Sequence, residues 1–309
     1  MRKNTELTKA GLALAGAAAV GASVYTVLRK QAQPLPEHPV LAENQPLVVA
    51  HRGGAGLWPP NTLYAFERAV AMGVDMLEMD VHPTADGVLV VRHNDTVDET
   101  TNGSGAIRDL TLAQIKELDA GYTWSADNGL THPYRGQGIT IPSFDEVLSA
   151  FPGVPMTVDI KSDNPEVVRP FGELLRKHNK LGEVFVGSFH DSQLSRYRKL
   201  CPESGTVAGE RETLLFLLLQ QFDMSAVFQA RAETFQLPEK EKGVRIITPD
   251  FIRRAHEHNI KVLIWTVNLQ GDMQRLLDWG VDGIITDYPD RLMELLGRER
   301  LDQRTNAAS

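Results

Sequence analysis

The chain has 309 residues, of which 42% are hydrophobic and 23% are charged, and its formal net charge at pH 7 is −8. This composition is ordinary for a soluble globular enzyme, and the length allows one large α/β barrel or two smaller domains. The acidic balance, with no basic run to offset it, argues against a nucleic-acid-binding surface, and the single cysteine, Cys201, excludes an intrachain disulfide.

Residues 1–30 differ in composition from the rest of the chain. Basic residues stand before and after an uncharged stretch at 10–28, which is long enough to span a bilayer but rich in Ala and Gly. Three interpretations compete: an uncleaved membrane anchor, a signal peptide cleaved near Ala22, and a soluble helix. We expect a membrane-anchored or exported protein, and because positive charge flanks both sides of the stretch, its orientation stays open.

Residues 31–46 are rich in proline and are predicted to link this segment to a folded domain at 47–296. The first elements predicted in that domain are a strand at 47–50, a helix at 63–72, a strand at 76–81 and a hairpin partner at 88–92. Residues 96–141 are polar and irregular, with one short helix expected at 112–118. A segment of this kind inside an α/β chain is usually an insertion near the functional site.

From residue 143 onward, strand and helix patterns alternate regularly. The predicted strands lie at 155–160, 184–187, 205–208, 226–229, 245–247, 261–267 and 283–286. The predicted helices lie at 144–150, 166–178, 192–200, 212–222, 249–258, 273–279 and 289–296. With 88–92 set aside, nine strand-like runs are predicted, close to the eight of a (β/α)8 TIM barrel with an insertion after its second strand. A doubly wound open sheet is the alternative, but no G-x-G-x-x-G turn supports it, and 297–309 form a tail.

Polar side chains gather where the predicted strands end, which in a (β/α)8 barrel is the face that carries the site. Glu78 and Asp80 lie two residues apart and so share one face of their strand, about 7 Å apart. Two carboxylates this close in an apolar run repel each other and lose hydration, so a cation or a strong donor should stand between them. The other polar residues of this set are His51, Arg52, His93, Asp159, Lys161, Ser188, Trp265 and Asp287.

These residues fall in motifs that resemble those of the glycerophosphodiester phosphodiesterases. The matching motifs are HRGGAG at 51–56, PNT at 60–62, LEMDV at 77–81, VVRHND at 90–95, TNGSG at 101–105, IPSFDEVL at 141–148, VDIK at 158–161, WTVN at 265–268 and GIITDYP at 283–289. The resemblance covers roughly residues 47–296, in the family's order and spacing. The family is similar to bacterial phosphatidylinositol phospholipases in its barrel and its two-histidine chemistry.

The resemblance implies a divalent metal, usually Mg or Ca, and the products sn-glycerol 3-phosphate and an alcohol. It places Glu78, Asp80 and Asp159 as metal ligands. Two positions depart from the family's pattern: Pro60 stands where the family usually has the Glu of PENT, and Asp159 stands where its third metal carboxylate is usually Glu. Because Asp is one methylene shorter, weaker metal binding or a bridging water is expected at Asp159.

The chemistry can also be argued from the residue types. One imidazole, from His51 or His93, can take a proton from the attacking hydroxyl while the other gives one to the leaving oxygen, because the histidine pKa of about 6.5 lies near working pH. Carboxylates hold a hard cation through oxygen, and the cation, Arg52 and Lys161 offset charge on the phosphoryl oxygens. Trp265 is expected to line the substrate. The attacking group is either the substrate's own 2-hydroxyl, through a cyclic phosphate, or water.

Other interpretations stay open. A lysophospholipase D releasing lysophosphatidic acid is the runner-up, because an N-terminal anchor would bring the enzyme to lipids. A catalytically inactive, membrane-tethered binding barrel is the alternative from another class. Ser188 and Asp287 are interpreted as structural, and His82 is left out of the site. The sequence does not indicate an oligomeric state, and the leucine-rich run at 214–219 is interpreted as a barrel-covering helix whose exposed face could contact lipid.

Overall fold

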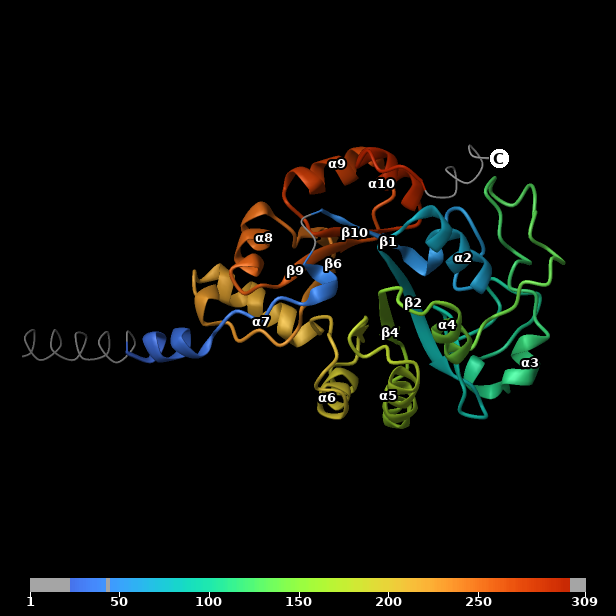
Figure 1. Ribbon diagram of the computed structural model, residues 1–309, viewed down its shortest axis with the longest axis horizontal. Coiled ribbons are helices and arrows are strands. Elements are labelled where there is room, and N and C mark those ends of the chain that lie inside the picture. Colours follow the sequence, from blue (N-terminus) through green and yellow to red (C-terminus); the bar gives the residue numbers. More distant parts are fainter. Residues whose placement is uncertain (1–22, 43–44, 301–309) are drawn as a thin grey trace, which may run out of the picture.

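A parallel β-barrel surrounded by helices forms the folded part of the chain (Figure 1). The computed structural model describes residues 23–42 and 45–300. The strands are β1 (Leu47–Ala50), β2 (Met76–Pro83), β3 (Leu89–Val91), β4 (Met156–Ile160), β5 (Val184–Gly187), β6 (Thr234–Pro238), β7 (Lys240–Glu241), β8 (Val244–Arg245), β9 (Lys261–Trp265) and β10 (Gly283–Thr286). The helices are α2 (Leu63–Met72), α3 (Leu112–Lys116), α4 (Phe144–Ala150), α5 (Val168–Lys177), α6 (Asp191–Leu200), α7 (Glu210–Gln221), α8 (Pro249–His256), α9 (Gln270–Asp278) and α10 (Pro289–Leu295).

Seven strands pair in parallel in the order β5-β4-β2-β1-β10-β9-β6. The gap between β5 and β6 is bridged by a very short strand, because Thr206 pairs in parallel with Val186 and Val207 pairs in parallel with Thr234. Eight parallel segments therefore close the sheet on itself, and the predicted (β/α)8 barrel is confirmed. The insertion after the second strand is confirmed as well: β3 pairs antiparallel with β2, and the predicted short helix is α3.

Two predicted strands are wrong, and two strands, β6 of the barrel and the short β7, were not predicted. Residues 225–227 of the predicted strand at 226–229 form a 3-10 turn. Val244–Arg245 belongs to the small β7–β8 hairpin outside the barrel. The sixth barrel strand is instead β6, at Thr234–Pro238, which pairs with β9 along its whole length. Its inward side chains are polar: Gln236 exchanges hydrogen bonds with Thr157 across the barrel, so the run lacks the apolar pattern of a buried strand.

The two-residue period of the strands decides which side chains enter the barrel. An apolar layer fills the barrel at the amino-terminal ends of the strands, with Val49, Met76, Phe185, Leu263 and Ile285 as buried members. The inward positions that come next along the strands are polar and form the candidate active site. The core thus ends where the site begins, and the helices bury the outward apolar side chains around the barrel.

The N-terminal segment reaches the barrel at its amino-terminal end. Residues 23–31 are helical, Leu35 N–H donates to the carbonyl of His258 at 3.1 Å, and Leu41 packs with Leu47 and Met76. No helix among the described residues is both long enough and apolar enough to cross a membrane. Most of the segment interpreted as an anchor or signal, residues 1–22, and the end of the predicted tail, 301–309, lie outside the described residues.

Candidate active site

His51 and Arg52 leave β1 in a tight turn that faces the barrel interior. The turn spans His51–Gly53, and Arg52 adopts left-handed backbone angles (φ 51°, ψ 30°), which are strained for a residue with a side chain. Gly53 also has positive φ, and a Cβ there would lie 2.9 Å from the Cβ of Ala65 on α2. Glycine at 53 therefore lets this loop sit directly on α2, and the loop in turn aims His51 across the barrel mouth.

His51 is held by two carboxylates. Its Nδ1 lies 2.6 Å from Oδ1 of Asp287, and its Nε2 lies 3.9 Å from Oε2 of Glu78. Because a carboxylate accepts, Nδ1 carries the proton in this pair and Nε2 is the nitrogen that faces the site. Burial alone would lower the His51 pKa, but Glu78 and Asp287 outweigh burial, so the pKa is raised.

Asp287 was expected at this end of the barrel but was interpreted as structural, and its carboxylate contacts His51. Asn268, from the WTVN motif, donates through Nδ2 to Oδ2 of Asp287 at 2.7 Å and accepts from the Asp287 backbone N–H at 2.9 Å. The chain Asn268–Asp287–His51 fixes the orientation of the imidazole. A signal was present, since Asp287 follows the last barrel strand directly, but nothing in the sequence says that it faces His51.

His93 follows the β2–β3 hairpin and lies near charged side chains of the site. Its Nδ1 lies 2.6 Å from Oδ1 of Asn94, which leaves Nε2 free. His82, which was left out of the site, donates through Nε2 to the carbonyl of His93 at 2.9 Å and so supports its backbone. Burial lowers the His93 pKa, and the charges of Asp80, Arg52 and Lys161 all act on this imidazole. Both predicted catalytic histidines therefore face one site.

The three predicted metal carboxylates stand on neighbouring strands of the barrel. Glu78 and Asp80 lie on β2, and Asp159 lies on β4 in register with Asp80. The Arg52 backbone N–H donates to Glu78 at 2.8 Å, and the Arg52 Nε lies 3.7 Å from Asp80. Burial, and then the charge of Asp80, raise the pKa of Glu78 to about 7. Gly187 makes room for Asp159, because a Cβ there would lie 2.6 Å from its Oδ1.

Lys161 bridges two of these carboxylates. Its Nζ lies 2.9 Å from Oδ1 of Asp80 and 2.7 Å from Oδ2 of Asp159. Burial would raise the pKa of Asp80, but Lys161 and Arg52 outweigh burial, so this pKa is lowered. Burial keeps the pKa of Asp159 raised even beside the ammonium. The ammonium is thus a cation already placed between Asp80 and Asp159.

The residues fit a divalent cation in donor type and in charge. All three side chains offer oxygen, which hard cations prefer, and the raised pKa values of Glu78 and Asp159 mark negative charge that a cation would stabilise. In the part of the chain that the structure describes, however, no three His, Cys, Asp or Glu side chains are placed together to hold a metal ion. A metal held by Asp80 and Asp159 together would have to displace the Lys161 ammonium.

An aromatic wall borders the site. Trp265, at the end of β9, meets the ring of Phe189 edge to face, with 6.4 Å between the ring centroids. Phe189 is 63% exposed, and the Nζ of Lys161 lies 4.9 Å from its ring. Sequence reasoning found Trp265 but missed Phe189, which lies in the loop after β5. Ser188 donates to the carbonyl of Ile160 at 2.7 Å, in keeping with a structural role.

Asn61 holds both the Asp80 carboxylate and the turn at His51–Gly53. Its Nδ2 donates to Oδ2 of Asp80 at 3.2 Å, its backbone N–H donates to the carbonyl of Arg52 at 2.9 Å, and its side chain is buried. The insertion contacts the same loop, because Trp124 Nε1 donates to the carbonyl of Ala55 at 3.0 Å. Asn61 thus contacts the site although Pro60 stands where this motif usually has an acid.

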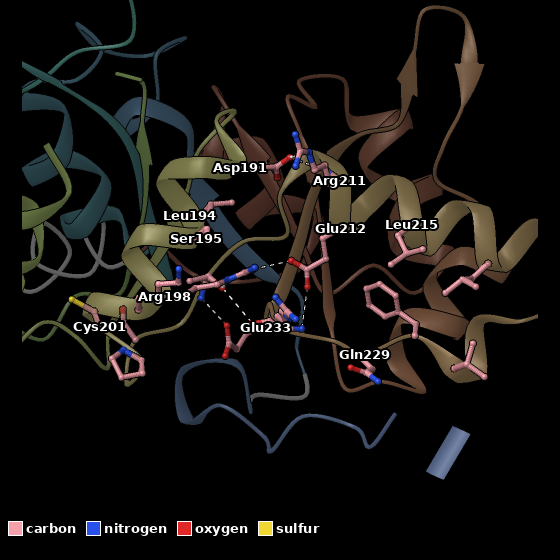
Figure 2. Close-up of a pocket in the computed structure, with 18 residues that line it drawn as sticks. Asp191, Leu194, Ser195, Arg198, Cys201, Arg211, Glu212, Leu215, Gln229 and Glu233 are labelled. Atoms are coloured by element: carbon pink, nitrogen blue, oxygen red, sulfur yellow. Dashed lines mark hydrogen bonds and ion pairs between the residues drawn. The ribbon is translucent and has the colours of Figure 1, made fainter. Parts of the chain in front are cut away.

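A separate cavity lies outside the barrel between α6 and α7 (Figure 2). It has a volume of about 930 Å³ and is lined by Arg198, Glu212 and Glu233 among others. Arg198 pairs with Glu212 at 2.8 Å, and the Glu233 carboxylate accepts from the Thr206 backbone N–H at 2.6 Å. None of the predicted site residues lines it, so the candidate active site is the barrel mouth.

Comparisons with known proteins show which proteins this chain is similar to. The model of the glycerophosphoryl diester phosphodiesterase family matches residues 51–291. A glycerophosphodiester phosphodiesterase of Bacillus subtilis is 33% identical over 267 residues, covering 81% of this chain and 86% of the relative. A lysophospholipase D of Homo sapiens is 26% identical over 273 residues, covering 80% and 85%. A phosphodiesterase of Oleispira antarctica, solved with the product sn-glycerol-3-phosphate, has a TM-score of 0.66 at 24% identity and covers 82% of this chain and 97% of its own.

Proposed function

Because the chain belongs to the glycerophosphoryl diester phosphodiesterase family, we propose that it hydrolyses glycerophosphodiesters to sn-glycerol 3-phosphate and an alcohol. Its relatives support an enzyme of the phosphoric diester hydrolase type. The observation that supports this mechanism is the pair His51 and His93. Each has its Nδ1 engaged by an oxygen, and both interact electrostatically with Arg52.

In the proposed reaction the two imidazoles exchange protons with the substrate. The Nε2 of one histidine takes the proton of the attacking hydroxyl as its oxygen bonds to phosphorus. The Nε2–H of the other gives a proton to the leaving oxygen as the bond between that oxygen and phosphorus breaks. Asp287 holds His51 in the orientation this needs. Arg52 and Lys161 bind the phosphoryl oxygens, which carry the negative charge.

We further propose that Glu78, Asp80 and Asp159 hold a divalent metal, Mg or Ca. When bound, such an ion supplies charge stabilisation for the phosphoryl oxygens. Arg52, whose backbone N–H donates to Glu78, keeps that carboxylate turned to the mouth of the barrel. Lys161 neutralises Asp80 and Asp159 and, once released from them, is free to contact the substrate phosphate.

The first attacking group is proposed to be the substrate's own 2-hydroxyl, which yields a cyclic phosphate that water then opens. Direct attack by water would use the same two histidines. A single-turnover experiment on glycerophosphocholine, quenched and examined by phosphorus NMR, separates the two routes. A cyclic glycerol phosphate supports internal attack, and its absence at every time point supports water.

A titration of activity with divalent metal is the experiment that tests the proposal as a whole. We expect chelation to abolish hydrolysis of glycerophosphocholine and Mg or Ca to restore it. The His51→Ala variant, folded but inactive at every metal concentration, is the matched control. Hydrolysis by the intact enzyme also rules out the inactive binding barrel, whereas a folded protein with no activity under any metal would favour it.

A second candidate activity is the lysophospholipase D reaction. The human relative carries that name, and the aromatic pair Phe189 and Trp265 gives the rim an apolar wall on which part of an acyl chain could lie. The two activities separate in a direct comparison of kcat/KM for glycerophosphocholine and lysophosphatidylcholine. We expect the first substrate to be preferred, and a strong preference for the second would reassign the activity.

We also propose that residues 1–30 act either as a membrane anchor or as a signal for export. Fractionation of cells that make the full chain, followed by mass spectrometry of its N-terminus, tests this. Recovery of an intact N-terminus in the membrane fraction supports an anchor, and cleavage near Ala22 supports a signal peptide.

A further inference from the structure

The helix α7 is apolar on its outer face as well as its inner face. Phe216 points into the core and is fully buried, whereas Leu214, Leu218 and Phe222, the residue just after the helix, are 65%, 54% and 67% exposed. An ordinary surface helix turns polar residues outward, and one that is hydrophobic all round is normally covered on every side. No described residue covers the outer face of α7, although its apolar side chains are large.

The exposed side chains form one continuous patch. Leu214, Leu218 and Phe222 follow one another at intervals of four residues, which places them in a row along the helix. Leu215 and Met224 are also exposed beside this row. We call these five residues the α7 stripe. A contiguous apolar patch of this kind on a soluble domain marks an interaction surface, in contrast to single exposed apolar residues.

The N-terminal segment joins the domain near the buried side of α7. The Leu35 N–H donates to the carbonyl of His258, and the ring of His258 lies 6.2 Å from that of Phe216 on α7. Figure 1 shows the helix at residues 23–31 leaving the domain at the same end of the molecule as α7. Val24 and Val27 on that helix are more than half exposed. Two apolar surfaces therefore emerge together at one end of the protein.

We propose that the α7 stripe lies on the surface of a lipid bilayer. The sequence that precedes the described helix is uncharged from residue 10 onward and is followed by Arg29 and Lys30, which suits a segment that enters or approaches a bilayer. Arg211, whose side chain is almost fully exposed at the start of α7, stands at the level of lipid phosphates when the leucines contact the acyl boundary. An apolar row beside an apolar N-terminal segment fits a lipid surface. Arg211, which pairs with Asp191, stands at the edge of the row together with the acidic Glu210 and Glu212.

This docking fixes the orientation of the barrel. The helix α7 begins after the carboxyl end of the short strand at 206–207 and ends near Met224 at the opposite end of the barrel, so the stripe runs along the barrel axis. The mouth with His51 and His93 then opens along the membrane surface. The proposal concerns a surface distant from the catalytic residues, so it stands or falls independently of the proposed reaction.

A local fluorescent probe tests the contact in the full-length protein. The Leu218→Cys variant is labelled with an environment-sensitive fluorophore and mixed with phosphatidylcholine vesicles, some carrying a nitroxide on the acyl chain. Cys201 is buried and stays unlabelled, which the wild-type protein verifies. The control is Glu67→Cys on α2, an exposed position on the opposite side of the barrel. Hydrolysis of soluble glycerophosphocholine in the same samples reports the catalytic site separately.

We expect the probe at 218 to shift its emission to shorter wavelength with vesicles and to be quenched by the nitroxide, while the probe at 67 responds to neither. The double variant Leu214→Ser, Leu218→Ser should lower the vesicle partition coefficient by roughly tenfold, with soluble activity unchanged.

Three results would overturn the proposal. A protein that binds vesicles with no response at 218 attaches through its N-terminus alone. If the emission of the probe at 218 shifts without lipid and the shift disappears on dilution, a second copy of the chain binds at the α7 stripe. A probe that is shielded without lipid at every concentration shows that the chain's own N-terminal segment covers the stripe.

Discussion

At the scale of single residues, the site consists of two imidazoles that are each oriented through Nδ1. Asp287 orients His51, and Asn94 orients His93. We expect His51→Gln and His93→Gln each to lower kcat for glycerophosphocholine by roughly 10²–10⁴-fold, the usual contribution of a proton-transferring side chain. Thermal unfolding should shift little, since both side chains lie at the barrel mouth. An active His93→Gln variant would remove that histidine from the mechanism.

Asp287 is predicted to act by positioning His51. In Asp287→Asn the amide can place an N–H against Nδ1, which favours the wrong tautomer, so kcat should fall by roughly 10²–10⁴-fold with KM nearly unchanged. The Asn268→Ala variant, which frees Asp287 without removing it, should cause a smaller fall. A structural role alone would instead lower the unfolding temperature and leave the kcat of the folded fraction intact.

We predict that Asp159 influences how tightly the site holds the proposed metal ion. Its carboxylate is engaged by Lys161 at 2.7 Å, and it is shorter than the Glu that the family usually has. We expect Asp159→Glu to lower the metal concentration needed for half-maximal activity, because the longer side chain reaches the ion with less displacement of Lys161. The Asp159→Asn variant, which loses charge, should raise that concentration. Identical metal titrations for all three proteins would show that Asp159 is only an ion-pair partner.

At the scale of elements, the junction of α7 and α8 depends on a neutral histidine. His258 is buried against Phe216 and Phe228, its Nε2 donates to the carbonyl of Ser225 at 2.8 Å, and its Nδ1 has no hydrogen-bond partner. Protonation would place an unpartnered charge at Nδ1, so burial lowers the His258 pKa below 6.5. The stabilising effect of the neutral form is therefore complete above pH 6.5 and is lost as the pH falls through the folded-state pKa.

The His258→Gln variant tests this pH dependence. Glutamine keeps a donor for the Ser225 carbonyl but cannot gain a proton, so its unfolding temperature should fall less between pH 7.5 and pH 5.5 than that of the wild type. The remaining histidines titrate alike in both proteins, so the difference isolates His258. Parallel curves for the two proteins would contradict the prediction.

Strands and helices were predicted correctly from the sequence where apolar side chains occupy the buried positions of the element. β2 carries Met76, Leu77 and Met79 among its buried residues, and its apolar run predicted a strand correctly. β6 was missed because Gln236 faces Thr157 in the barrel interior, where a strand pattern should be apolar. Val227 and Phe228 were predicted as a strand because they are apolar, but they are buried by a turn under α7. An apolar run indicates that its residues are buried, but not whether they form a strand, a helix or a turn.

At the scale of the whole molecule, the site was largely predictable because a barrel brings strand ends together. The two-residue period places Glu78, Asp80 and Asp159 on the inner face, and the closed sheet adds His51 from the neighbouring strand. The sequence does not predict which side chains contact one another across the mouth of the barrel. The contacts of Asp287 with His51, and of Lys161 with both aspartates, depend on loop angles and side-chain rotamers that no spacing rule contains.

The barrel has the fewest paired strand positions between β5 and β6. There Thr206 and Val207 make one bridge to each neighbour, whereas β2 and β4 pair at five positions. The Glu233 carboxylate secures this seam by accepting from the Thr206 N–H at 2.6 Å, and Val207 N–H donates to the Val186 carbonyl at 2.9 Å. Because so few hydrogen bonds join here, local opening at this seam should require less free energy than opening at β2 and β4.

Hydrogen exchange followed by mass spectrometry or NMR measures that difference directly. We expect the amides of Val207 and Ala208 to exchange faster than those of Met79 and Val158 in the unliganded protein. Glu233→Ala should accelerate exchange at Val207 further and leave Val158 unchanged, because the variant removes only the carboxylate that holds the short strand. Equal protection at both seams would mean that the helices α6 and α7, rather than strand pairing, hold the barrel closed.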